Sequence, residues 1–114
     1  MDFRTTYERL LRRLGYDVVA AGRGADGLRA ADCLPILLVI SDLKLPDIDG
    51  IDLIRALCAR ASPPPVIVVS GLISVETRRA ALAAGATAYL TKPFSLSALT
   101  ALIREVLGVP RAGP

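Results

Sequence analysis

The 114 residues of this chain, 53% of them hydrophobic, suit a single domain that buries a sheet between helices, and a second, output domain is not expected. The net charge of +3 comes from scattered arginines and only 4% of the residues are aromatic, which argues against direct binding of nucleic acid. No apolar run approaches the roughly 20 residues that span a bilayer, and the first residues lack the apolar core of a signal peptide, so we expect a cytoplasmic protein without a membrane segment.

The first half of the chain is predicted to alternate between helix and strand. A helix is predicted from apolar residues at helical spacing, with Gly15 as its C-terminal cap. The last strand of this half is an unbroken apolar run, typical of a fully buried strand, and it leads directly into Asp42. The predicted elements are a helix over residues 3–14, a strand over 16–21, a short helix at most within 22–32, and a strand over 36–41.

The second half continues the alternation. Ser74 and Ser95 are expected to cap the N-termini of two helices. We place the domain at residues 1–108, because residues 109–114 have the Gly and Pro content of a tail or linker. The predicted elements are a helix over residues 51–61, a strand over 66–69, a helix over 74–84, a strand over 88–91 and a helix over 95–107.

Three polar residues follow the three buried strands. Alternating strands and helices predict a parallel sheet with right-handed crossovers and helices on both faces, a three-layer α/β/α fold. Asp42, Ser70 and Lys92 would then converge at the carboxyl ends of the strands, where open α/β sheets bind ligands. An ionised Asp42 can act as a nucleophile toward phosphorus, while Lys92 and Ser70 can stabilise phosphoryl oxygens.

Each of these residues also has an ordinary structural explanation. A single aspartate after a strand is more often a cap, a serine after an apolar run is usually a turn former, and a lysine before proline is usually solvated. Asp47 and Asp49 are expected to cap or brace the turn before Gly50. The combination of the three strand ends, in this order, is what favours a phosphoryl-transfer site.

The stretch from Val39 to Gly50, together with Ser70 and Lys92-Pro93, resembles the CheY-like receiver domain of two-component response regulators. The resemblance implies a flavodoxin-like, doubly wound parallel sheet. It also implies Asp42 as the phosphoacceptor, Ser70 as the hydroxyl residue that follows the phosphoryl group, and Lys92 as the lysine of the Lys-Pro motif, with a cis Lys92-Pro93 bond. Tyr89 matches the aromatic switch of the family, although a half-buried strand tyrosine is the simpler explanation from the residues alone.

The chain departs from the family pattern near its start. The first strand of the family, and the acidic pair that binds Mg²⁺ together with Asp42 and the carbonyl of Lys44, would lie upstream of Met1. Asp42 alone would hold Mg²⁺ weakly. Burial worth roughly 8 to 15 kcal/mol would be absent with that strand. The stability of a typical domain is about 5 to 15 kcal/mol, so a monomer of these residues is expected to be marginal. The second helix is expected to be stunted.

The expected function is to accept a phosphoryl group on Asp42 from a histidine kinase or phosphotransfer protein and to signal by conformational change, with at most self-catalysed phosphotransfer and dephosphorylation as enzymatic activity. The alternative is a pseudo-receiver that is not phosphorylated and works by docking or dimerising. A flavin or nucleotide enzyme is disfavoured, because no G-x-G-x-x-G follows a strand. Neither the output partner nor the cognate kinase can be read from the sequence.

A homodimer is the expected assembly. With no central strand, the strand of residues 36–41 would have an unpaired edge, and such an edge recruits other chains. Two copies could exchange elements or pair their sheets. The resemblance to the receiver family implies that the helix of residues 95–107, with the neighbouring strand and helix, could provide a second contact. The other possibility is that the outer strands close up and leave a smaller, looser monomer.

Overall fold

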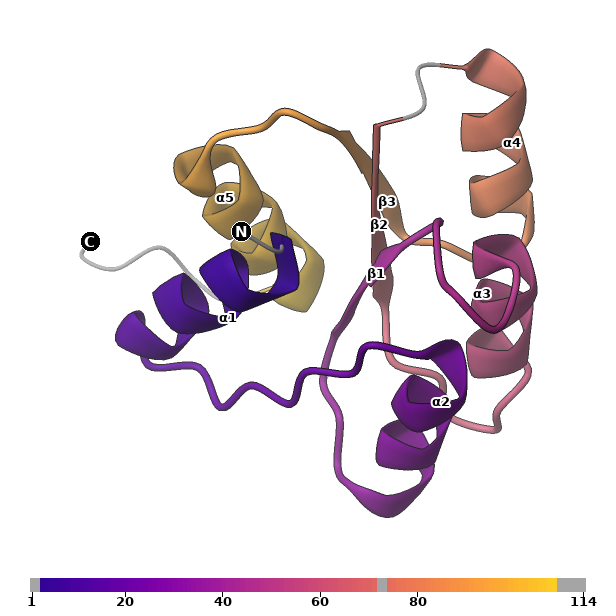
Figure 1. The fold of residues 1–114 in the computed structure, drawn as a ribbon, viewed down its shortest axis with the longest axis horizontal. Helices are drawn as coiled ribbons and strands as arrows, with labels where there is room; N and C mark the ends of the chain where they lie inside the picture. Colours follow the sequence, from indigo (N-terminus) through magenta and orange to yellow (C-terminus); the bar gives the residue numbers. More distant parts are fainter. Residues whose placement is uncertain (1–2, 72–73, 109–114) are drawn as a thin grey trace.

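In the computed structural model, three parallel strands form a sheet between two layers of helices (Figure 1). The structure describes residues 3–71 and 74–108, so the predicted tail at 109–114 lies outside the described residues. The described elements are α1 (Phe3–Arg13), α2 (Gly24–Cys33), β1 (Val39–Asp42), α3 (Gly50–Cys58), β2 (Val66–Ser70), α4 (Val75–Ala83), β3 (Ala88–Thr91) and α5 (Leu96–Leu107). Helices α1 and α5 lie on one face of the sheet, and α2, α3 and α4 lie on the other. The predicted three-layer α/β fold is confirmed.

The sheet has the strand order β1-β2-β3, and the central strand β2 is buried along its whole length. Successive side chains of a strand point to opposite faces of the sheet. Val66 and Val68 therefore pack into the cluster of α3 and α4, whereas Ile67 and Val69 pack with α1 and α5. Burial on both faces explains why β2 reads as an unbroken apolar run.

Residues 16–21 are not a strand in the structure, so this prediction is wrong. In the flavodoxin-like order, this segment would pair with a strand lying between it and β1, and the described residues contain no such strand. Because residues 16–21 have no neighbouring strand to pair with, a backbone group of this segment forms a hydrogen bond with a side chain instead. The guanidinium of Arg12 donates to the carbonyl of Val18 at 2.9 Å. The side chain of Val19 is 57% exposed.

Helix α2 is ten residues long, so the expectation of a stunted second helix is also wrong. Both of its ends are held by residues far along the chain. At the N-terminus, the carboxylate of Asp47 accepts bonds from the backbone N–H groups of Gly24 and Ala25. Near the C-terminus, the guanidinium of Arg60 binds the Asp32 carboxylate and the carbonyl of Leu28. These contacts compensate for the weak local helix signal.

The other helix ends follow local signals. Ser74 and Ser95 cap α4 and α5 as predicted, each accepting a bond from a backbone N–H three residues on. Gly15 ends α1 with a φ of 96°, a conformation that suits glycine. None of the helices in the described part of the chain is long and apolar enough to cross a membrane.

Candidate functional site

The predicted strand-end site is built around an ion pair between Asp42 and Lys92. Asp42 is the last residue of β1, and its Oδ2 atom lies 2.5 Å from the Nζ atom of Lys92, which directly follows β3. The Asp42 and Lys92 side chains are 28% and 29% exposed, respectively. The carboxylate is therefore held by the ion pair and remains partly accessible to solvent.

The second oxygen of Asp42 is also engaged. Its Oδ1 atom accepts a bond of 3.0 Å from the backbone N–H of Lys44, in the loop that follows β1. One oxygen therefore contacts an ammonium group from β3, and the other contacts a backbone amide from the adjacent loop. These two contacts fix the orientation of the carboxylate.

Ser70 ends β2, between the strands that carry Asp42 and Lys92. The register pairs Asp42 with Val69 and Ser70 with Thr91, so the three strand ends lie at the same edge of the sheet. The Ser70 carbonyl accepts a 2.8 Å bond from the backbone N–H of Lys92, which ties the lysine backbone to β2. Ser70 itself is only 1% exposed. The Lys92-Pro93 bond is cis, as the resemblance implies.

Tyr89 lies in β3 opposite Val68 and is half-buried. It packs against the cluster formed by α3, α4 and the sheet. This position agrees with the simpler explanation, in which Tyr89 is an ordinary half-buried tyrosine of a strand. A switch role for Tyr89 stays a prediction.

The described residues do not by themselves make a magnesium site. The candidate oxygen donors are the Asp42 carboxylate and the carbonyl of Lys44, and both Asp42 oxygens already accept bonds. Within residues 3–71 and 74–108, no group of three His, Cys, Asp or Glu residues could hold a metal. Mg²⁺ prefers six oxygen ligands in near-octahedral geometry, so these donors would leave most of its coordination to water.

Asp47 has a different contact from the one predicted. It was expected to brace the turn before Gly50, but its Oδ1 and Oδ2 atoms lie 2.7 Å and 3.0 Å from the backbone nitrogens of Gly24 and Ala25. The N–H groups of Ala25 and then Gly24 lower the pKa of Asp47 below its ordinary value. Asp49 does brace the turn, because it caps α3 through the N–H of Ile51. Asp49 directly precedes α3, the usual position of an N-cap aspartate, whereas the partners of Asp47 lie more than 20 residues away and have no local signal.

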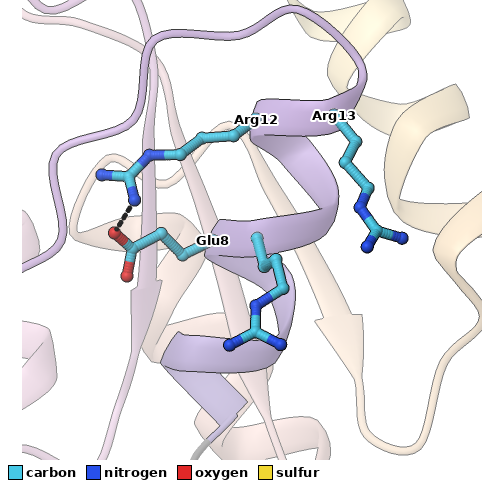
Figure 2. Close-up of a pocket in the computed structure, with 4 residues that line it drawn as sticks. Glu8, Arg12 and Arg13 are labelled. Atoms are coloured by element: carbon cyan, nitrogen blue, oxygen red, sulfur yellow. Dashed lines mark ion pairs between the residues drawn. The ribbon is translucent and has the colours of Figure 1, made fainter.

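A hollow on α1 lies outside this set of residues. Figure 2 shows its lining, in which Glu8 forms an ion pair of 2.7 Å with Arg12 while Arg13 points away from that pair. The fourth lining residue is Arg9. The hollow contains none of the predicted site residues, and its excess of arginine makes it basic.

A parallel sheet with helices on both faces, and with a carboxylate, a hydroxyl residue and an ammonium at its strand ends, defines a flavodoxin-like α/β protein whose site lies at the carboxyl edge of the sheet. The family model of the response regulator receiver domain matches residues 1–104. The chain therefore belongs to the family of response regulator receiver domains of two-component systems, as the sequence resemblance predicted.

Two curated relatives illustrate the similarity. The chain is 39% identical over 106 residues to the transcriptional regulatory protein PrrA of Mycobacterium tuberculosis, covering 93% of this chain and 46% of that protein. It is 43% identical over 93 residues to the transcriptional regulatory protein KdpE of the same organism, covering 82% of this chain and 41% of that protein. The chain thus spans less than half the length of these relatives.

Solved structures show the same fold. A CheY-like response regulator receiver domain protein from Methanospirillum hungatei matches with a TM-score of 0.84 and 32% identity, over 91% of this chain and 83% of that one. The receiver domain of a sensor histidine kinase from Pseudomonas aeruginosa matches with a TM-score of 0.83 and 29% identity, over 91% and 87%. The latter structure holds a magnesium ion in its active site cleft.

Proposed function

We propose that Asp42 accepts a phosphoryl group from a histidine kinase or a phosphotransfer protein. The observation that carries this proposal is the position of the Asp42 carboxylate between the Lys92 ammonium and the Lys44 amide, at the carboxyl ends of the strands. Receiver domains interact with such donors, and one similar structure, from Burkholderia pseudomallei, contains a phosphorylated aspartic acid.

In the proposed reaction, a carboxylate oxygen of Asp42 attacks the phosphorus of a phosphohistidine. The new O–P bond forms as the N–P bond breaks, and the leaving imidazole nitrogen keeps the electron pair and takes up a proton. The attacking carboxylate and the phosphoryl group are both anionic, so the reaction needs nearby positive charge. Lys92 supplies one such charge, and the Ser70 hydroxyl supplies a hydrogen-bond donor at the end of the neighbouring strand.

We also propose that residues 1–108 act as the receiver and that residues 109–114 are a tail or linker. The chain spans less than half of relatives that are transcriptional regulatory proteins. A receiver of this kind passes its signal to an output partner, and a conformational change coupled to Asp42 is the expected route. Tyr89 is the proposed reporter of that change.

Treatment of the chain with acetyl phosphate and a magnesium salt, followed by mass analysis, tests the assignment. We expect an acyl phosphate on Asp42 and none in the Asp42→Asn variant. An acyl phosphate on Asp47 or Asp49, with none on Asp42, contradicts the assignment.

The second candidate function is a pseudo-receiver that works by docking or dimerising. It is favoured because no group of three His, Cys, Asp or Glu residues in the described part of the chain could hold a metal ion. For the 114-residue chain, we expect labelling much slower than in receivers with an acidic pair, because phosphoryl transfer depends on charge neutralisation and single cationic groups are worth about 10³ to 10⁵ in rate in related reactions. Complete absence of labelling would support the pseudo-receiver, whereas labelling at ordinary receiver rates would contradict both the slow-labelling expectation and this second function.

A further inference from the structure

We propose that Asp47 is a positioning residue, which holds the loop of residues 43–49 against the N-terminus of α2 and thereby keeps the Lys44 amide on Asp42. The catalytic consequence rests on the proposed phosphoacceptor function. The structural consequence, a coupling between α2 and the Lys44 amide, does not depend on it.

The contact between the loop and α2 is made by charge and by close packing. Asp47 accepts bonds of 2.7 Å and 3.0 Å from Gly24 and Ala25, which are more than 20 residues away in the sequence. Next to it, Ile48 lies so close to Gly24 that a Cβ atom on residue 24 would be 2.0 Å from the Ile48 Cγ2 atom. The side chains of Asp47 and Ile48 therefore dock the loop onto one turn of α2.

The other end of the loop is packed against α3. A Cβ atom on Gly50 would lie 2.5 Å from the Cα atom of Leu43 and 2.6 Å from its carbonyl oxygen. Lys44 lies between these two contacts, with its backbone N–H 3.0 Å from Asp42 Oδ1. The direction of that N–H is therefore set by packing at Gly50 on one side and by the Asp47 contact on the other.

Asp47 caps the N-terminus of α2, which has no capping side chain from the residues next to it in the sequence. The N-cap residue of α2 is Arg23, and its side chain makes no capping bond. The first N–H groups of a helix lack partners within the helix and carry partial positive charge, so a carboxylate there is stabilising. Because the capping residue belongs to the loop after β1, the same two hydrogen bonds cap the N-terminus of α2 and hold the loop against it.

Asp49 provides the matched comparison. It is an exposed aspartate in the same loop and also caps a helix, but its bond of 2.8 Å goes to Ile51, two residues away. Loss of Asp49 should therefore disturb only the start of α3. Loss of Asp47 should release the loop from α2 and free the Lys44 amide.

Amide hydrogen exchange measured by NMR tests the coupling without any phosphorylation. In Asp47→Ala, we expect faster exchange at Gly24, Ala25 and Lys44. In Asp49→Ala, we expect faster exchange at Ile51 with Lys44 unchanged. If Asp47→Ala speeds exchange at Gly24 and Ala25 but leaves Lys44 as in the unmodified chain, Asp47 is only a helix cap and the proposal is overturned.

A second variant covers the case in which Asp47→Ala fails to fold. Gly24→Ala keeps Asp47 but forces Ile48 away from α2, and it should also raise the exchange rate at Lys44. Asp47→Asn retains one side-chain oxygen as an acceptor, so it should restore part of the protection at Lys44. Unchanged Lys44 exchange in Gly24→Ala would likewise overturn the coupling.

Labelling with acetyl phosphate then gives the functional result. We expect Asp47→Ala to lower the maximal labelling rate at Asp42 by about tenfold to a hundredfold, because small misplacements of reacting groups have effects of this size. The donor concentration at half-maximal rate should stay the same, and Asp47→Asn should recover part of the rate. If the unmodified chain is not labelled at all, the proposed function fails, while the exchange measurements still decide the role of Asp47.

Discussion

Lys92 reaches Asp42 across the end of β2, since β1 and β3 are not neighbours in the sheet. Their side-chain atoms are 2.5 Å apart, although the residues are 50 positions apart in the sequence. Ser70 is the last residue of the strand between them. The ion pair therefore connects the two outer strands at their carboxyl ends, where the proposed reaction takes place.

Replacement of Lys92 by methionine should slow labelling of Asp42 by about 10² to 10³-fold, the size of effect seen when one preorganised charge or donor is removed from a reacting oxyanion. The free energy of unfolding should change by about 1 kcal/mol or less, because the pair is partly exposed. Comparison of labelling rates and urea melts separates the two effects. Arg79→Met, at an exposed cation on α4, is the control and should leave both values unchanged. Undiminished labelling in Lys92→Met would remove Lys92 from the site.

Gly50→Ala should destabilise the fold by about 1 to 3 kcal/mol, the usual effect of forcing extra atoms into a packed site. A methyl group at residue 50 would overlap the backbone of Leu43, which has no flexible side-chain end to move aside. Gly71→Ala is the matched control, because a Cβ atom there meets nothing within 4 Å. Thermal or urea unfolding of the two variants measures the difference, and equal stability would show that the loop adapts without strain.

The Asp47 contact should make stability depend on pH at the acid end. Hydrogen bonds from Ala25 and Gly24, with a smaller contribution from the charge of Arg23, lower the pKa of Asp47 below 3.8 in the folded state. The carboxylate therefore adds stability that is fully present above about pH 3.8 and is lost as the pH falls through the lower folded pKa. Unfolding of the unmodified chain and Asp47→Asn, compared from pH 7 to pH 2, should show a difference that shrinks below pH 3.8. A constant difference would mean that the charge of Asp47 contributes nothing.

The sequence predicted those elements whose causes are local. The caps at Ser74 and Ser95, the buried strand predicted at residues 66–69 and the strand at residues 88–91 all carry their own signals. The predicted strand at residues 16–21 and the predicted short α2 were wrong because each depends on distant residues: the first needs a partner strand, and the second is completed by Asp47 and Arg60. For the site, the positions of Asp42 and Lys92 at strand ends were predictable, since parallel strands place their carboxyl ends together. Their ion pair joins residues 50 positions apart, so no local pattern encodes it, whereas the Lys44 contact spans only two residues and is of the local Asx-turn kind.

The predicted homodimer depends on the side of β1 that has no neighbouring strand. In the described residues, β1 pairs only with β2, and its other side has no ladder. Three of the exposed apolar residues lie in the segments that precede this strand in the sequence: Val19 at 57%, Leu34 at 45% and Leu37 at 75%. An unpaired edge with apolar neighbours favours pairing with another chain, and a two-fold dimer is the commonest closed assembly.

We therefore expect the chain to form a homodimer at micromolar concentration, measured by light scattering. Leu37→Lys should dissociate this dimer, because a charge beside the open edge opposes strand pairing, and the high exposure of Leu37 keeps the cost to the monomer small. Val75→Lys, at the start of α4 and 68% exposed, is the matched control and should leave the dimer intact. Dissociation by Val75→Lys alone would move the interface to the α4 side of the molecule. A cooperatively melting monomer of 12.0 kDa would refute the dimer and indicate that the outer segments close around β1 instead.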